Sequence, residues 1–322
     1  MTGAVSAPLP DAAPANWVDR HAPPALRPWL KLGRFDRPTG IWLLMLPGWQ
    51  GIALAASARG RLPDLRLFAL FAVGAALMRA AGCAYNDIVD KDFDARVERT
   101  AGRPIPSGQI SVKGAWAFLA ACSLASLAVL VVLNRLSIVL GVASLALVAA
   151  YPFMKRITWW PQAWLGLTFN WGAPLGFAAA GGWDAGAAGA AISGLMLYAS
   201  GFFWTLGYDT IYAVQDLEDD ALAGVKSSAR RLGRAAPRAV FGFYLAALGL
   251  ALAAGLAARL GLLFWPLAAA YGAALFVQAP RLRLDDPVRA LGLFKANVPA
   301  ALILLAAIVA GGLVQSISLR AR

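Results

Sequence analysis

A series of apolar stretches of about 20 residues restricts what this chain can fold into more than any other feature. A stretch of that length can cross the hydrocarbon core of a bilayer as an α-helix. Helices are expected rather than barrel strands, because lipid cannot satisfy backbone groups and the stretches do not alternate between apolar and polar residues. About nine spans are predicted, at residues 38–57, 66–85, 113–133, 136–154, 161–181, 188–209, 238–258, 261–279 and 291–314. The expected fold is an all-α, polytopic membrane bundle.

The composition favours one membrane bundle over two soluble domains, since 60% of the 322 residues are hydrophobic and 14% are charged. Residues 1–24 are rich in Ala and Pro and lack a basic start leading into an apolar core. We therefore predict a flexible tail at 1–24 rather than a signal peptide. Residues 25–322 are predicted to form the intramembrane domain, in which the basic and apolar segment 25–36 lies along the membrane surface.

The net charge of +12 is assigned to membrane topology and anionic lipid, not to nucleic acid. With the N-terminus in the cytoplasm, 22 of the 29 Lys and Arg residues fall on the cytoplasmic side of the predicted spans. The protein is thus expected in the cell inner membrane. Cys83 and Cys122 lie in apolar surroundings and are predicted to be free, and a single histidine, His21, excludes a multi-histidine metal site.

Ten of the 17 acidic residues fall in two short windows, 87–98 and 209–220. Acidic side chains beside a bilayer are costly, so this concentration indicates a bound ion or a catalytic task. Both windows are predicted on the cytoplasmic face, about 125 residues apart, and each follows an apolar helix and precedes a basic, glycine-containing loop. The pattern favours two pseudo-repeated halves.

The spacing within each window places carboxylates on one helix face. Asp87, Asp90 and Asp94 fall at i, i+3 and i+7, beside Asn86, and Asp209, Asp216 and Asp220 fall at i, i+7 and i+11, with Tyr212 on the same stripe. Such carboxylates repel one another, and Mg²⁺ relieves the repulsion while keeping sites for phosphate oxygens. The alternative is a set of salt bridges to Lys91, Arg96, Arg99, Lys226 and Arg230. Two matching clusters favour the metal site over the salt bridges.

Four basic residues are candidates for binding an anionic substrate. Lys155 and Arg156 end a predicted span, and Lys226 follows Gly224, so each could mark topology or bind phosphate. Arg79 lies inside an apolar span, seven residues before Asn86 and on its face, which favours binding of an acidic group.

These motifs resemble the UbiA family of intramembrane aromatic prenyltransferases. The resemblance rests on Asn86-Asp87-x-x-Asp90-x-x-x-Asp94, on Tyr208-Asp209-Thr210-Ile211-Tyr212-Ala213-x-Gln215-Asp216-x-x-Asp219-Asp220, and on Gly224-x-Lys226-Ser227. It continues in Arg37-Pro38-Thr39-Gly40, Arg103-Pro104-x-Pro106-Ser107-Gly108, Tyr151-Pro152-x-Met154-Lys155-Arg156, Trp160-Pro161-Gln162 and Gly166-Leu167-Thr168-Phe169-Asn170-Trp171-Gly172. It spans about residues 30–315.

The resemblance implies a helical bundle around a central cavity and a Mg²⁺-dependent transfer of a polyprenyl group from its diphosphate. The form of the second motif is most similar to members that prenylate 4-hydroxybenzoate, ortho to its hydroxyl, in ubiquinone biosynthesis. It implies that Asp87, Asp90, Asp94, Asp216 and Asp220 hold Mg²⁺ and that Asp209 is a candidate base. Two alternatives stay open: another aromatic acceptor, and an ion-coupled transporter, which would place its acids near the bilayer midplane.

Overall fold

The computed structural model describes residues 16–96, 98–184, 188–217, 221 and 224–320. Every regular element in these ranges is helical, which confirms the predicted all-α fold. The chain divides into two compact units: unit 1 comprises residues 1–42 and 73–129, and unit 2 comprises residues 43–72 and 130–322. The division falls within α3 (Thr39–Ala58) and within α4 (Leu65–Val89), so neither unit is a sequential half of the chain.

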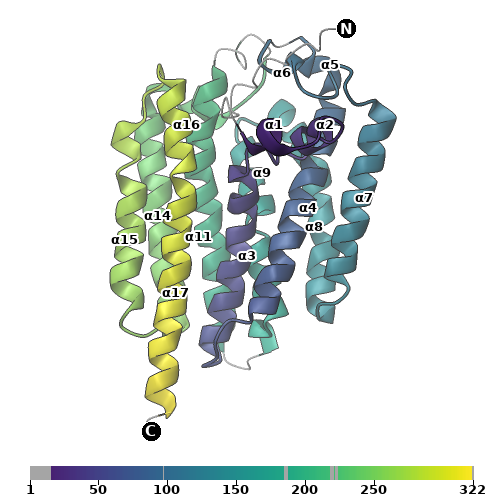
Figure 1. Ribbon diagram of the computed structural model, residues 1–322. Coiled ribbons are helices and arrows are strands. Elements are labelled where there is room, and N and C mark those ends of the chain that lie inside the picture. Colours follow the sequence, from purple (N-terminus) through teal and green to yellow (C-terminus); the bar gives the residue numbers. More distant parts are fainter. Residues whose placement is uncertain (1–15, 97, 185–187, 218–220, 222–223, 321–322) are drawn as a thin grey trace. The chain divides into compact units, whose positions relative to one another are not determined.

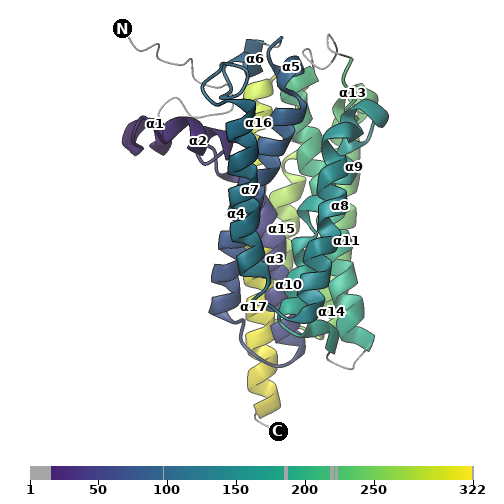
Figure 2. The same ribbon diagram turned by 90° about the vertical axis from the view of Figure 1, so that its right-hand side faces the viewer.

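Unit 1 contains two short N-terminal helices, α1 (Trp17–His21) and α2 (Arg27–Leu32), which lie next to each other (Figure 2). The side chain of Asn16 caps α1 by accepting a hydrogen bond from the Asp19 amide at 3.0 Å. An ion pair of 2.7 Å joins Asp19 to Lys31, and Val18 is fully buried. The structure thus places a docked helix in the last part of the segment that the sequence predicts to be a flexible tail.

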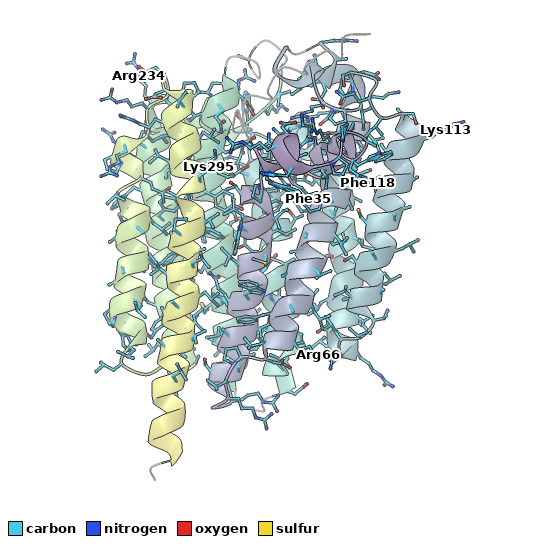
Figure 3. The ribbon with its side chains drawn as sticks, viewed as in Figure 1. Phe35, Arg66, Lys113, Phe118, Arg234 and Lys295 are labelled. Atoms are coloured by element: carbon cyan, nitrogen blue, oxygen red, sulfur yellow. The ribbon has the colours of Figure 1, made fainter. Side chains whose placement is uncertain are left out.

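The rest of unit 1 consists of the second half of α4, the one-turn helices α5 (Lys91–Asp94) and α6 (Glu98–Ala101), and α7 (Val112–Leu130). Ala80, Ala81 and Cys122 form one of its apolar clusters, and Phe35 and Phe118, labelled in Figure 3, pack against it. Cys83 and Cys122 are both free and buried, as predicted.

Unit 2 holds the rest of α3, the first part of α4 and the helices that follow residue 130. These later helices are α8 (Arg135–Ile157), α9 (Pro161–Phe169), α10 (Gly172–Ala179), α11 (Ala188–Tyr212), α13 (Ser228–Leu232), α14 (Ala236–Ala257), α15 (Phe264–Phe276), α16 (Pro287–Lys295) and α17 (Asn297–Arg320). Short 3₁₀ segments lie at Gly182–Asp184, Ala213–Asp216, Gly233–Ala235 and Ala279–Arg281. Helix α14 packs against α11 and α15, and α15 packs against α17 (Figure 1). The buried face of α14 carries Ala247, Ala251 and Ala254, because small side chains let membrane helices approach closely.

The predicted count of nine spans is not confirmed, since seven of the described helices are long and apolar enough to cross a bilayer. Two predicted spans differ in form. Residues 161–181 form two short helices, because the chain breaks at Asn170, whose Nδ2 donates to the Gly166 carbonyl at 2.8 Å. Residues 261–279 form only the 13-residue α15, which rises about 20 Å against a hydrocarbon core of about 30 Å.

Glycines bring α3 and α10 together within unit 2. A Cβ atom on Gly176 would overlap the Gly48 carbonyl oxygen, and a Cβ on Gly172 would lie 3.2 Å from the Gly48 amide nitrogen. The two backbones therefore pack directly on each other, as glycine-rich membrane helices do.

We expect Gly176→Ala to destabilise the protein by about 1–3 kcal/mol, because the added methyl group must force the two backbones apart. The measurement is thermal unfolding of the purified protein in detergent. Gly249→Ala is the matched control, since Gly249 is an exposed residue of α14 and a Cβ atom added there would meet no other atom within 4 Å. Equal unfolding temperatures for the two variants would contradict the close approach.

Candidate functional site

The first aspartate motif lies where α4 ends. The Asp90 amide donates to the Asn86 carbonyl at 2.9 Å and the Asp94 amide donates to the Asp90 carbonyl at 2.8 Å. This four-residue spacing continues the helical path from α4 into α5 and keeps the motif on one side of the chain. Asp87, Asp90 and Asp94 expose only 0%, 1% and 3% of their surface, whereas Asn86 is half-buried. Three acids are thus buried together in unit 1.

Two arginines that were not predicted as site residues bind these carboxylates. Nη2 of Arg34 donates to both carboxylate oxygens of Asp87, at 2.7 and 2.9 Å. Nη1 of Arg103 donates to Asp94 at 2.7 Å and to Asp87 at 3.3 Å. Asp87 and Asp94 therefore lie within hydrogen-bonding distance of one nitrogen atom.

Arg34 is held in an unusual conformation for this contact. Its φ angle is +60°, in the left-handed region that non-glycine residues rarely adopt, and only 9% of its surface is exposed. Nη1 donates to the Lys31 carbonyl at 3.1 Å, which fixes the guanidinium above the C-terminal turn of α2. Strained backbone of this kind is concentrated at functional sites.

The salt-bridge partners predicted from the sequence are not those of Asp87 and Asp94. Lys91 and Arg96 are exposed, and the ion pairs of these two aspartates are made with Arg34 and Arg103. Within the described part of the chain, no three acidic, histidine or cysteine side chains are arranged as a metal centre. The cationic partners of Asp87 and Asp94 are guanidinium groups in this structure.

The electrostatics of the motif nevertheless suit a divalent cation. Burial raises the pKa of the Asp94 carboxyl group, the Arg103 guanidinium opposes the rise, and the nearby carboxylates of Asp87 and Asp90 add to it. Asp87 and Asp94 share one cationic nitrogen, which shows that a positive charge is accommodated at their oxygens. Carboxylate oxygens are also the ligands that Mg²⁺ prefers. The donor set of the first motif therefore fits Mg²⁺.

Arg79 lies against the start of α3 within unit 1. A Cβ atom on Gly40 would be 2.8 Å from Nε of Arg79 and 2.9 Å from its Nη2. Glycine at position 40 is thus required for the half-buried guanidinium to lie where it does. The Pro38-Thr39-Gly40 sequence and Arg79 form one feature, although they are far apart in the chain.

The second aspartate motif lies at the end of α11 in unit 2. Asp209 and Tyr212 belong to α11, but Asp216 ends a 3₁₀ segment, Ala213–Asp216. A 3₁₀ helix turns about 120° per residue and an α-helix about 100°, so the predicted straight stripe from Asp209 to Asp216 is bent. Asp209, Tyr212 and Asp216 are half-buried, and Asp220 lies outside the described residues.

The predicted basic residues of unit 2 meet at the C-terminus of α8. The Lys226 amide donates to the Lys155 carbonyl at 3.1 Å, and Nζ of Lys226 donates to the Ile157 carbonyl at 3.2 Å. A positive charge is stabilised there by the helix dipole. The guanidinium of Arg230 lies 5.5 Å from the centre of the Trp159 ring. Lys155, Arg156 and Lys226 therefore form one basic corner.

Buried hydrogen bonds join this basic corner to the second motif. Thr210 and Ser228 share a hydroxyl–hydroxyl bond of 2.7 Å, and the Ser228 amide donates to Oε1 of Gln162 at 3.0 Å. Thr210 follows Asp209 in α11, and Ser228 lies two residues after Lys226. None of these three residues was predicted as a site residue, although polar side chains in apolar segments were a visible signal.

An aromatic and polar layer supports the second motif. The ring of Tyr212 lies 4.7 Å from that of Phe294, and the ring of Tyr208 lies 4.9 Å from that of Trp204. Trp204 Nε1 and the Tyr244 hydroxyl both donate to Oδ1 of Asn297, at 2.9 and 3.1 Å. The end of α11 is thus fixed to α14, α16 and α17.

We expect Arg34→Ala to cost about 3 kcal/mol of stability, because it removes the two-oxygen contact to a carboxylate that is fully buried. Thermal unfolding in detergent measures the effect. Arg283→Ala is the control, since Arg283 is exposed. If both variants unfold at the same temperature, Arg34 does not stabilise Asp87.

Comparison with known proteins shows the family to which the chain belongs. Residues 44–298 match the model of the UbiA prenyltransferase family. A curated relative from Bos taurus, "4-hydroxybenzoate polyprenyltransferase, mitochondrial", is 45% identical over 300 residues, covering 93% of this chain and 79% of the relative.

Solved structures share the fold, among them those of two UbiA homologs. The apo structure of a UbiA homolog from Aeropyrum pernix K1 is 29% identical, with a TM-score of 0.70, covering 83% of this chain and 96% of that one. A UbiA homolog from Archaeoglobus fulgidus bound to GPP and Mg²⁺ is 20% identical, with a TM-score of 0.61, covering 87% of this chain and 99% of that one. The chain belongs to the UbiA prenyltransferase family.

Proposed function

We propose that the protein transfers a polyprenyl group from a polyprenyl diphosphate to the carbon of 4-hydroxybenzoate ortho to its hydroxyl group, in ubiquinone biosynthesis. The observation that carries the proposal is the buried Asp87, Asp90 and Asp94 set, contacted by arginines in a chain 45% identical to a protein named for this activity. A different aromatic acceptor is the second candidate. Membership of a prenyltransferase family weighs against an ion-coupled transporter.

The two motifs supply ligands for Mg²⁺ in this proposal. Asp87, Asp90 and Asp94 would hold Mg²⁺ in unit 1, and Asp216 and Asp220 would likewise hold Mg²⁺ in unit 2. When bound, Mg²⁺ supplies positive charge to the departing diphosphate, where negative charge grows. The UbiA homolog from Archaeoglobus fulgidus is bound to GPP and Mg²⁺, which supports the same choice of metal.

The basic corner of unit 2 stabilises the leaving group. Lys155, Arg156 and Lys226 are cations that meet at one helix end, so they can bind phosphate oxygens as the carbon–oxygen bond of the donor breaks. The aromatic ring of Tyr212 is assigned to the prenyl group. The hydrogen bonds among Thr210, Ser228 and Gln162 keep these groups in register.

The remaining residues act on the acceptor. Arg79 and Asn86 share one face of α4, and the guanidinium of Arg79 binds the carboxylate of 4-hydroxybenzoate. The ring carbon then forms a carbon–carbon bond to the prenyl group, and the ring proton leaves. Asp209 accepts this proton, or the released diphosphate does. Exclusion of water protects the allylic cation.

We place the site on the cytoplasmic side of the cell inner membrane. The support is the excess of Lys and Arg in the loops that precede α3 and follow α4 and α8. The seven apolar helices make the chain an integral membrane protein. The relative from Bos taurus is mitochondrial by its name, so the cell inner membrane is proposed on the charge pattern of this chain alone.

Asp87→Asn and Asp216→Asn should each lower prenyl transfer roughly 100-fold or more, because each removes a metal-binding charge. The assay follows prenylated 4-hydroxybenzoate made from geranyl diphosphate by the purified protein with Mg²⁺. Asp285→Asn is the matched control, since Asp285 is exposed and outside both motifs. Near-normal turnover in either motif variant would remove that residue from the metal site.

Arg79→Ala should raise KM for 4-hydroxybenzoate about tenfold, because a charged hydrogen bond to the carboxylate is lost, and should leave KM for geranyl diphosphate little changed. Arg79→Lys should recover part of the loss. Steady-state kinetics with each substrate varied in turn measure the effect. An unchanged KM for 4-hydroxybenzoate would show that Arg79 does not bind the acceptor.

A further inference from the structure

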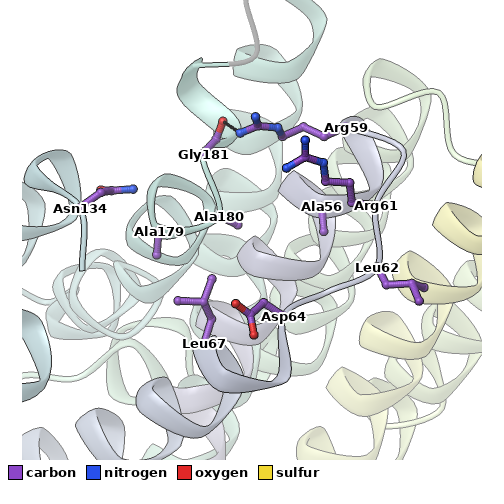
Figure 4. Close-up of a pocket in the computed structure, with 10 residues that line it drawn as sticks. All are labelled: Ala56, Arg59, Arg61, Leu62, Asp64, Leu67, Asn134, Ala179, Ala180 and Gly181. Atoms are coloured by element: carbon purple, nitrogen blue, oxygen red, sulfur yellow. Dashed lines mark hydrogen bonds between the residues drawn. The ribbon is translucent and has the colours of Figure 1, made fainter. Parts of the chain in front are cut away.

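A polar hollow lies in unit 2, at the end of the helices where α3 finishes and α8 begins (Figure 4). Its volume is about 330 Å³, at the small end of the range of about 300–1,000 Å³ for ligand pockets. Arg59, Arg61, Asp64 and Asn134 line it together with apolar residues that include Leu62 and Leu67. Lys155 and Arg156 lie at the other end of the 23-residue α8, which rises about 34 Å. The hollow is thus separate from the basic corner.

Hydrogen bonds hold one side of the hollow in place. Nη1 of Arg59 donates to the Gly181 carbonyl at 3.0 Å, as Figure 4 shows. Gly181 has a φ angle of +73°, and a Cβ atom there would overlap the Arg59 guanidinium. Asn134 joins α8 to α10, since its Nδ2 donates to the Ala178 carbonyl at 2.6 Å and its Oδ1 caps α8. Only glycine at position 181 permits this placement of Arg59.

The charges of the lining favour an anion. The side chain of Arg61 makes no hydrogen bond or ion pair with the residues that the structure describes, and its guanidinium is turned toward the same side of the hollow as that of Arg59 (Figure 4). Asp64 uses Oδ1 to accept from the Arg66 amide at 2.8 Å. Two guanidinium groups and one carboxylate leave a charge of +1, which a singly charged phosphodiester balances.

The surroundings of the hollow are apolar as well as basic. Leu62, in the connection from α3 to α4, and Leu65, the first residue of α4, expose 65% and 77% of their surface. They follow a 20-residue membrane span, so they lie at the level where headgroups meet acyl chains. A ligand that suits this place has an anionic head and a hydrocarbon tail.

We propose that this hollow binds the phosphodiester headgroup of an anionic phospholipid, with Arg59 and Arg61 as donors and the acyl chains along Leu62 and Leu65. A prenyl diphosphate suits it less, because that headgroup carries more negative charge than a lining of +1 can balance. Asp64 is also the only carboxylate among the described residues that line the hollow, so the lining offers one acidic ligand for a metal ion that would accompany a diphosphate. The site lies outside the proposed catalytic residues, so its loss leaves the chemical step intact.

The test uses the full chain purified in detergent and compares phosphatidylglycerol with phosphatidylcholine, by native mass spectrometry of retained lipid. The wild-type protein should retain phosphatidylglycerol preferentially. Arg61→Gln should weaken that retention roughly tenfold while leaving the unfolding temperature unchanged, since it breaks no contact within the described residues. Arg59→Gln should weaken retention as well. Arg281→Gln with Arg283→Gln is the control, because both arginines are exposed and outside the hollow.

Equal retention of the two lipids by the wild-type protein would overturn the proposal, and so would undiminished phosphatidylglycerol retention in Arg61→Gln. Inorganic phosphate and glycerol phosphate are tested separately as competitors of the bound lipid. If millimolar concentrations of either displace the lipid completely, the site is for a soluble phosphate and the lipid assignment is wrong. Failure of displacement together with loss in Arg61→Gln supports the lipid headgroup.

Discussion

Burial of negative charge is the constraint on which unit 1 depends. Asp87 is fully buried, and an isolated carboxylate in that position would cost several kcal/mol of desolvation free energy. The two-oxygen contact from Arg34 and the shared contact from Arg103 offset this cost. These contacts also explain the local backbone, since Arg34 adopts a left-handed conformation and the chain from Thr100 to Arg103 turns back toward α5. The contacts that compensate this buried carboxylate thus shape the chain around it.

Unit 2 meets a different constraint, because its helices must bury polar side chains among small apolar ones. Asn297 accepts hydrogen bonds from Trp204 and Tyr244, and donates to Gln278 at 2.9 Å. Such bonds give helices in lipid a direction that apolar packing does not. The alanine face of α14 and the glycine contact between α3 and α10 add close van der Waals packing. The end of α11, which carries the second motif, is thereby held on several sides.

Features that depend on local periodicity and composition could be predicted from the sequence. The all-helical fold follows from apolar length, and the first motif keeps its helical spacing because the bond from Asp94 to Asp90 continues the path of α4. The pairing of Arg34 with Asp87 could not be predicted, since 53 residues separate them and a positive φ angle at arginine has no compositional signal. The break at Asn170 depends on side-chain contacts within unit 2, such as its 2.7 Å bond to Thr205. The 3₁₀ turn that ends at Asp216 could not be predicted either. Its winding differs from that of an α-helix by about 20° per residue, and over so short a segment this difference does not alter the amphipathic spacing of the sequence.

The charged groups of the two motifs are stabilised in different ways. In unit 1, the acids are buried and the arginines come to them from other segments, so the charges are balanced by tertiary contacts. In unit 2, the basic residues lie at the C-terminus of α8, where the helix dipole already favours positive charge, and Asp216 lies on a half-buried turn after α11.

The position of Lys226 shows how the arrangement in unit 2 suits the proposed substrate, a diphosphate that binds together with a metal ion. Its ammonium group donates to the Ile157 carbonyl, which is a neutral acceptor, and makes no ion pair with the residues that the structure describes. Two further donors of the ammonium group are therefore available to the phosphate oxygens of the proposed substrate. The bond from the Ser228 amide to Gln162 fixes the chain beside Lys226, and the bond from Ser228 to Thr210 ties the same turn to the helix that carries Asp209. Because Thr210, Ser228 and Gln162 are neutral, they set the spacing of the charged groups without competing for the phosphate or the metal that we propose these groups bind. Acidic side chains in place of these three would neutralise part of the positive charge that binds a diphosphate in the proposed function.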